Sequence, residues 1–127
     1  IGVYFGFDKE LAHLIEAGSD IFVMPSKYEP CGLNQMYSMR YGTIPVVRAT
    51  GGLDDTVEDH TGGGKGTGFK FEQYDAKDLL KALQRAHKVF QQPEEWKKLM
   101  RNGMAKDFSW EHSARKYVNL YKELLKQ

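Results

Sequence analysis

Two short apolar runs, separated by a helical segment, constrain the fold more than any other feature of this sequence. Ile21–Met24 contains no polar residue, which is typical of a strand buried on both faces of a parallel sheet. Residues 36–41 have helical character, and Gly42 supplies a helix stop. The second run, Pro45–Arg48, opens with proline, which a strand tolerates at its first residue. This alternation predicts an α/β fold built on a parallel sheet.

The residues before this unit continue the alternation. Ile1–Phe5 is expected to form a further strand. Asp8 is expected to cap a helix that ends at Gly18, with Leu14 and Ile15 on its apolar face. The N-terminal stretch has no basic segment of the kind that opens a signal peptide, so none is expected.

The second half of the chain is expected to be mainly helical. A short strand over residues 68–71 is followed by helices whose starts are marked by Asp75, Pro93 and Ser109. In the last of these helices, apolar residues recur at helical spacing. Residues 60–68 are rich in glycine and are expected to form a mobile surface loop.

Composition limits the chain to one domain and excludes several functions. Its 127 residues are 41% hydrophobic and 13% aromatic, which suffices for one core. The net charge of +1 gives no bulk attraction to nucleic acid or to an anionic membrane, and no apolar run reaches membrane-spanning length. Cys31 is the only cysteine, so no internal disulfide can form and a reducing compartment is expected. The histidines show no metal-ligand spacing, so no metal is expected.

The loop between the first apolar run and the next helix carries the candidate site. Glu29 follows the strand, at the edge of an open α/β sheet where ligands bind. The N–H groups of Gly32, Leu33 and Asn34 open the helix, where free donors and the positive end of the dipole suit a phosphate. A carboxylate beside a phosphate cradle indicates chemistry on a phosphorylated or nucleotide-linked substrate. Two structural alternatives stay open: Glu29 caps a neighbouring N–H, and the glycine only permits the turn.

Two further segments allow both a structural and a functional interpretation. Phe7 lies at the end of the first expected strand, where core packing is the simplest role for an aromatic residue. Thr50–Leu53 follows the Pro45–Arg48 run at the same edge of the sheet. It either forms a tight turn or lines the ligand site, and the sequence favours neither.

Motifs at fixed spacing connect these residues to a family. They are Ser26–Leu33 (Ser-Lys-Tyr-Glu-Pro-Cys-Gly-Leu), Met39–Arg48, Thr50–Leu53 (Thr-Gly-Gly-Leu) and Phe108–Trp110. Together they resemble bacterial glycogen synthases and plant starch synthases, over essentially the whole chain. Enzymes of that family have the GT-B fold, with two Rossmann-like domains, and are several times longer. The resemblance implies that residues 1–127 are a single partial domain: half of the C-terminal Rossmann-like, donor-binding domain, with C-terminal helices.

The resemblance also implies an activity and roles for the residues of the site. Such enzymes are retaining glucosyltransferases that pass glucose from ADP-glucose to the non-reducing end of an α-1,4-glucan, without a metal or other cofactor. Glu29 would lie against the transferred sugar and stabilise positive charge at its anomeric carbon. The N–H groups of Gly32, Leu33 and Asn34 would hold the diphosphate, and Phe7 would stack on the adenine. The chain alone is expected to be inactive, because the acceptor site belongs to the N-terminal domain of the same protein.

Cys31 is assigned to packing and to the sugar pocket, since no histidine adjoins it in sequence to make it a nucleophile.

Two other functions stay open: a retaining transferase of the same fold that uses a UDP-sugar, and a sugar-nucleotide-binding module without catalysis. Many transferases that use other sugar nucleotides have a second glutamate where this chain has Tyr37, which favours the synthases. The expected location is the bacterial cytoplasm or the plastid stroma, with no nucleic-acid or membrane partner.

Overall fold

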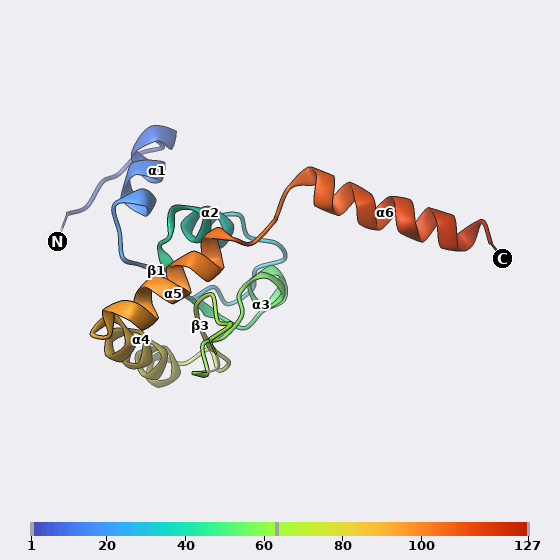
Figure 1. Ribbon diagram of the computed structural model, residues 1–127. Helices are drawn as coiled ribbons and strands as arrows, with labels where there is room; N and C mark the ends of the chain where they lie inside the picture. The colour runs from blue at the N-terminus through green and yellow to red at the C-terminus, as the bar shows by residue number, and fades with distance from the viewer. Residues whose placement is uncertain (1, 63, 127) are drawn as a thin grey trace.

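A three-stranded parallel sheet forms the centre of the computed structural model, which describes residues 2–62 and 64–126 (Figure 1). The strands are β1 (Ile21–Met24), β2 (Ile44–Arg48) and β3 (Phe69–Phe71). Their order in space is β1-β2-β3, and both pairs are parallel. β2 is therefore the central strand, and all of it except Arg48 is buried. The predicted α/β fold with a parallel sheet is confirmed.

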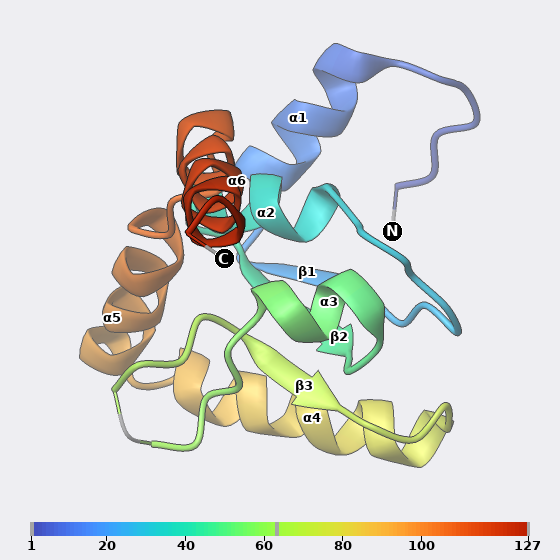
Figure 2. The same cartoon turned by 90° about the vertical axis from the view of Figure 1, so that its right-hand side faces the viewer.

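Helices cover both faces of this sheet (Figure 2). In the described residues they are α1 (Lys9–Ala17), α2 (Asn34–Tyr41), α3 (Gly51–Thr56), α4 (Ala76–Phe90), α5 (Pro93–Met104) and α6 (Trp110–Leu124). Val46 of β2 belongs to an apolar cluster on one face that includes Leu99 of α5 and residues of α4. Val47 points to the other face, as successive residues of a strand do, and packs in a second cluster with Leu53 of α3 and residues of α2.

Local sequence signals determine most of the helix ends. Asp8 accepts a hydrogen bond from a backbone N–H in the first turn of α1, at 3.0 Å. Asp75 and Ser109 cap α4 and α6 in the same way, and Pro93 is the first residue of α5. Gly42 ends α2 with a φ of 85°, in the left-handed region that favours glycine. The prediction of these elements is confirmed, apart from small shifts at their ends.

The strand predicted over Ile1–Phe5 is wrong for the residues that the structure describes. Gly2–Phe5 form no strand, and the side chains of Val3 and Phe5 are exposed. Ile1 lies outside the described residues. An apolar run becomes a stable strand only where neighbouring strands pair with it, and the sheet of the described residues consists of β1, β2 and β3.

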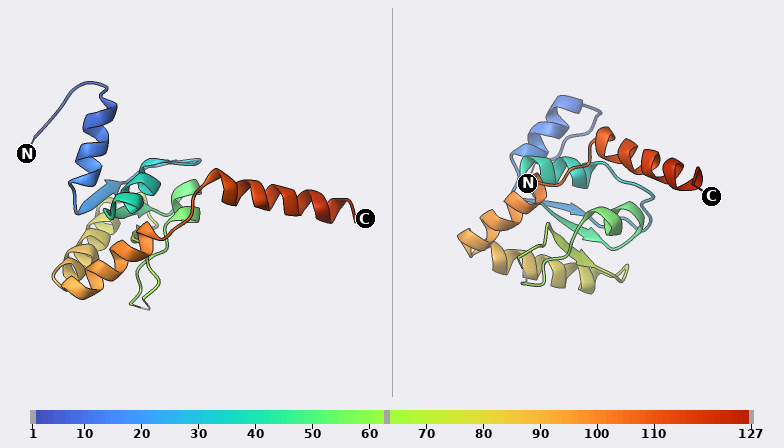
Figure 3. Two further views of the ribbon diagram at one scale, coloured as in Figure 1. Left: turned by 45° about the horizontal axis from the view of Figure 1, so that its top comes forward. Right: turned by 45° about the vertical axis from the view of Figure 1, so that its right-hand side comes forward.

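The apolar faces of the first and last helices are exposed. In α1, Leu14 and Ile15 are exposed, whereas Glu16 is buried. None of the α6 residues that the structure describes is buried, and this helix extends away from the sheet (Figures 1 and 3). The periodicity of a sequence shows which face of a helix is apolar, but it does not show whether another element covers that face.

The loop before β3 is packed against the rest of the protein where it meets the strand. Thr67 is fully buried, and its Oγ1 accepts a hydrogen bond from a backbone N–H at 2.9 Å. Asn102 of α5 donates through Nδ2 to the carbonyl oxygens of Gly64 and Gly66, at 2.9 Å in both cases. The expectation of a mobile surface loop is therefore wrong for the part of the loop next to β3. The side chain of Asn102, which is distant in sequence, holds that part in place. Gly63, also part of that expectation, lies outside the described residues.

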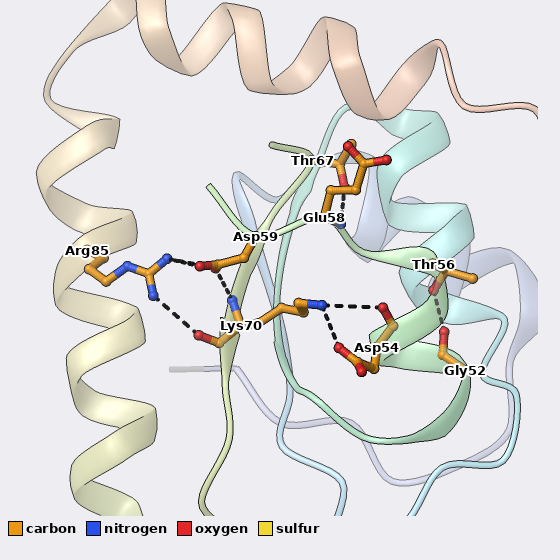
Figure 4. A network of polar contacts seen from close by, with 8 residues as sticks. All are labelled: Gly52, Asp54, Thr56, Glu58, Asp59, Thr67, Lys70 and Arg85. Carbon is orange, nitrogen blue, oxygen red and sulfur yellow. Dashed lines mark hydrogen bonds and ion pairs between the residues drawn. The ribbon is translucent and has the colours of Figure 1, made fainter. Parts of the chain in front are cut away.

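Side chains cover the outer edge of β3 (Figure 4). The N–H of Lys70 donates to Oδ1 of Asp59 at 2.6 Å, and the carbonyl of Lys70 accepts from Nη1 of Arg85 at 3.3 Å. Nη2 of Arg85 also contacts both carboxylate oxygens of Asp59, at 2.6 and 2.8 Å. These Lys70 groups point away from β2, because the carbonyl that faces β2 belongs to Phe71, which accepts from the N–H of Ala49 at 2.7 Å.

Candidate functional site

The candidate site lies where the loop after β1 meets the start of α3, at the carboxyl ends of β1 and β2 (Figure 2). The N–H of Gly52 donates to the carbonyl of Glu29 at 3.1 Å, which joins the two segments directly. A Cβ on Gly51 would lie 2.2 Å from the carbonyl oxygen of Glu29. A Cβ on Gly52 would lie 1.8 Å from the carbonyl oxygen of Cys31. Both glycines therefore allow a backbone approach that no other residue permits.

This contact clarifies the role of Thr50–Leu53. The segment is the N-terminal turn of α3, with Thr50 as the N-cap, and not a free turn between elements. It supports the loop that carries Glu29, so it is part of the same site. Whether it also lines the donor pocket stays a prediction.

Glu29 is partly buried, and its carboxylate takes part in none of the hydrogen bonds or ion pairs of the described residues. The capping role that the sequence left open is therefore not found. A carboxylate without a protein partner, at the ligand edge of a sheet, is free to interact with a bound molecule. The catalytic role of Glu29 stays a prediction.

The start of α2 presents unpaired backbone donors beside Glu29. Leu33 is the N-cap and makes no side-chain capping bond, and Asn34 is the first helical residue. Among the described hydrogen bonds, none begins at the N–H of Gly32, Leu33 or Asn34. Free N–H groups at a helix N-terminus are what an anion such as a phosphate binds. The structure thus brings together all three donors that the sequence selected, and their binding to a diphosphate stays a prediction.

Cys31 and Phe7 are both exposed. The Sγ of Cys31 lies 3.7 Å from the carbonyl oxygen of Gly32, and the packing part of its expected role is not found. Phe7 precedes α1 and is 89% exposed, so the core-packing alternative is wrong here. An exposed ring is available for stacking on a base, and the stacking role stays a prediction.

Gln35 and Arg48 support the loop and were not selected from the sequence. Gln35 is fully buried, and its Nε2 donates to the carbonyls of Cys31 and Gly32 at 3.2 and 2.9 Å. Arg48, the last residue of β2, donates through Nη1 to the carbonyl of Lys27 at 2.6 Å. A cation at the end of a buried strand could have drawn attention to Arg48. Nothing in the sequence marks Gln35, whose contacts depend on the folded loop.

The described residues contain no helix that is both long and apolar enough to cross a bilayer. They also contain no group of three or more His, Cys, Asp or Glu side chains arranged to bind a metal ion.

The chain belongs to the group 1 glycosyltransferases, because the sequence model of the family Glycosyl transferases group 1 matches residues 3–103. Within it, the chain is similar to bacterial glycogen synthases. It is 57% identical over 122 residues to the glycogen synthase of Koribacter versatilis (strain Ellin345). The aligned region covers 95% of this chain and 25% of that protein. It is 55% identical over 129 residues to glycogen synthase 1 of Methylococcus capsulatus, covering 98% of this chain and 26% of that protein.

Solved structures agree with this similarity. The catalytic domain of starch synthase IV from Arabidopsis thaliana, solved bound to ADP and acarbose, matches with a TM-score of 0.84 and 41% identity. The match covers 96% of this chain and 26% of that one. Sucrose-phosphate synthase from Thermosynechococcus elongatus matches with a TM-score of 0.67 and 31% identity, over 94% of this chain and 29% of that one. The resemblance to glycogen and starch synthases is confirmed, and the chain spans about a quarter of the length of the curated relatives it matches.

Proposed function

We propose that the protein carrying this sequence is a glycogen or starch synthase, and that this chain supplies the donor side of its active site. The protein transfers glucose from ADP-glucose to the non-reducing end of an α-1,4-glucan, with retention and without a metal ion. The observation that carries the proposal is a Glu29 carboxylate next to N–H groups at the start of α2, all without partners among the described residues, in a chain 57% identical to a glycogen synthase.

Each residue of the site has a defined task in this proposal. The N–H groups of Gly32, Leu33 and Asn34 hold the diphosphate of the donor and neutralise charge on the leaving group. The Glu29 carboxylate lies near the anomeric carbon and stabilises the positive charge that develops as the bond to the diphosphate breaks. The exposed ring of Phe7 stacks on the adenine.

The remaining parts of the reaction are assigned to the rest of the protein. Cys31 adjoins the sugar, and the N-terminal domain of the same protein supplies the acceptor site and closes the cleft. A closed cleft excludes water and aligns the two sugars, which this chain alone does not accomplish. The partners are ADP-glucose and an α-1,4-glucan, and the bacterial cytoplasm or the plastid stroma is the proposed location.

A charge-removing substitution tests the proposal. In the full-length protein, Glu29→Gln is expected to lower kcat about 100- to 1000-fold with a much smaller change in donor KM, because the lost interaction forms mainly in the transition state. Transfer of radiolabelled glucose to a glucan primer measures both constants. A variant within about threefold of the wild type would show that Glu29 has a structural role only.

The donor is tested separately, because a transferase of the same fold could use a UDP-sugar. The wild-type protein is given equal concentrations of ADP-glucose and UDP-glucose in one reaction with a glucan primer. Preferential transfer from ADP-glucose is expected. Preferential transfer from UDP-glucose would overturn the donor assignment but not the proposed glucosyltransferase activity. Absence of transfer from either donor would overturn the proposed function.

A further inference from the structure

A buried side-chain bridge joins the two segments of the candidate site. The Nε2 of Gln35 lies within hydrogen-bond distance of three acceptors, the carbonyls of Cys31 and Gly32 and, at 3.1 Å, Oγ1 of Thr56, which share its two hydrogens. Gln35 is fully buried, so water does not compete for these contacts. One amide group thereby connects the loop before α2 to the end of α3.

Thr56 passes this connection back to the loop. Its hydroxyl accepts from Gln35. It also donates to the carbonyl of Gly52 at 2.5 Å, the contact that Figure 4 shows. The N–H of Gly52 in turn donates to the carbonyl of Glu29 at 3.1 Å. The contacts form a closed ring from Glu29 through Gly52, Thr56 and Gln35 to Cys31, two residues beyond Glu29. A displacement of α3 is therefore transmitted to the loop from both ends.

The ring includes a buried acceptor that the described residues leave without a partner. Oε1 of Gln35 makes no hydrogen bond there, which lowers stability because the atom has lost its water. The amide cannot be turned to relieve this, because Oε1 would then face two carbonyl oxygens. Gly32 provides the space for this group, since a Cβ there would lie 2.5 Å from Oε1. An apolar side chain at position 35 would fill this part of the core without burying an unpaired oxygen. The amide of Gln35 therefore has a role beyond packing.

We propose that Gln35 and Thr56 are positioning residues for glucosyl transfer. They fix the backbone from Glu29 to Asn34 so that the carboxylate and the unpaired N–H groups keep one geometry toward the donor. The role of these two residues in transfer rests on the proposed function, whereas the ring of contacts itself does not. Neither residue touches the reacting atoms. They act through Gly52 and through the carbonyls of Cys31 and Gly32.

The matched variants are Thr56→Val, Thr56→Ser and Thr67→Val. Valine has the shape of threonine but lacks the hydroxyl, and serine keeps the hydroxyl. Thr67 is the control: it is fully buried, whereas Thr56 is half-buried, and its Oγ1 accepts from the N–H of Glu58 at 2.9 Å, outside the ring (Figure 4). Each variant is made in the full-length protein. Thermal unfolding, kcat and donor KM are measured for each.

Thr56→Val is expected to lower kcat about 10- to 100-fold, because displacements near 1 Å at a reacting centre have effects of this size. Thr56→Ser is expected to stay close to the wild type. Thr67→Val is expected to lower the unfolding temperature by at least as much as Thr56→Val, because Thr67 is the more deeply buried residue, with kcat unchanged. If Thr56→Val does not accumulate as folded protein, Thr56→Ala, which adds no atoms, replaces it. A kcat within twofold of the wild type for a folded Thr56 variant without the hydroxyl would overturn the proposal.

Hydrogen exchange separates a failure of this inference from a failure of the proposed function. Backbone exchange of the peptide covering residues 50–55, which contains the Gly52 N–H that donates to the carbonyl of Glu29, is compared in wild type and Thr56→Val. Faster exchange in that peptide, with unchanged exchange around Thr67, supports the bridge even if the wild type transfers no glucose. Unchanged exchange over residues 50–55 would overturn it, whatever the activity of the wild type.

Discussion

A single methyl group at Gly52 is expected to disable the site, and the structure gives the size of the effect. In Gly52→Ala the added Cβ would lie 1.8 Å from the carbonyl oxygen of Cys31, and Cβ atoms do not come closer to a neighbour than 3.0 Å. The gap from 1.8 to 3.0 Å is 1.2 Å. The obstructing atoms are backbone, so rotation of a side chain cannot relieve the clash. Either α3 or the loop that carries Glu29 has to move by about that amount.

Such a movement has two measurable consequences. Misplacement of a catalytic group by about 1 Å lowers the rate about 100-fold. Overpacking of a tight site lowers the free energy of unfolding by about 1–3 kcal/mol. We therefore expect Gly52→Ala in the full-length protein to fold with reduced stability and to lose about two orders of magnitude in kcat. Initial rates of glucan elongation at saturating ADP-glucose and a thermal unfolding curve on the same preparation measure both effects.

Gly103→Ala is the matched control. Gly103 is also a buried glycine within a helix, but an added Cβ would lie 3.3 Å from side-chain atoms of Met39, which small adjustments can accommodate. This variant is expected to retain its kcat. Wild-type kcat and unfolding temperature in Gly52→Ala would refute the reasoning, because they would mean that the two segments do not approach each other as described.

Two further predictions concern Phe7 and Glu16. Phe7→Ala is expected to raise the KM for ADP-glucose about 5- to 150-fold, since stacking on a base contributes about 1–3 kcal/mol, while Phe7→Tyr stays near the wild type. Because Phe7 is 89% exposed, the unfolding temperature should not change, and an unchanged KM would contradict stacking. Burial raises the pKa of Glu16 above its ordinary value of 4.5, and His13 opposes this in part. The folded state therefore binds the proton more tightly than the unfolded state, so this contribution to stability is present below pH 4.5 and is lost as the pH rises through the folded pKa. Glu16→Gln should raise the unfolding temperature at pH 7, with a gain that shrinks toward pH 4. A gain independent of pH would show that the charge is not responsible.

The parts of the fold that the sequence predicts are those governed by local chemistry. A side chain at Asp75 caps a helix, and glycine at position 42 ends one, through contacts within a few residues. The strand expected over Ile1–Phe5 depends on a pairing partner, so periodicity alone predicts it wrongly for the described residues.

The candidate site divides in the same way. Glu29 and the N–H groups at the start of α2 follow from their place after a buried strand, which the sequence reveals. The bridge from Gln35 to Thr56 joins residues 21 positions apart, and its geometry exists only once α3 packs against the loop. A motif indicates which residues are present, but contacts of this kind depend on tertiary structure.

The covered edge of β3 has a consequence for the behaviour of the protein in solution. An exposed strand edge is a template on which another chain can add a strand and begin aggregation. Asp59 and Arg85 occupy the outward N–H and carbonyl of Lys70, so an incoming strand would first have to displace the ion pair between these two side chains. The same sheet has no such ion pair among the described contacts along β1. Pairing with a strand of another chain is therefore opposed at the β3 edge of the sheet.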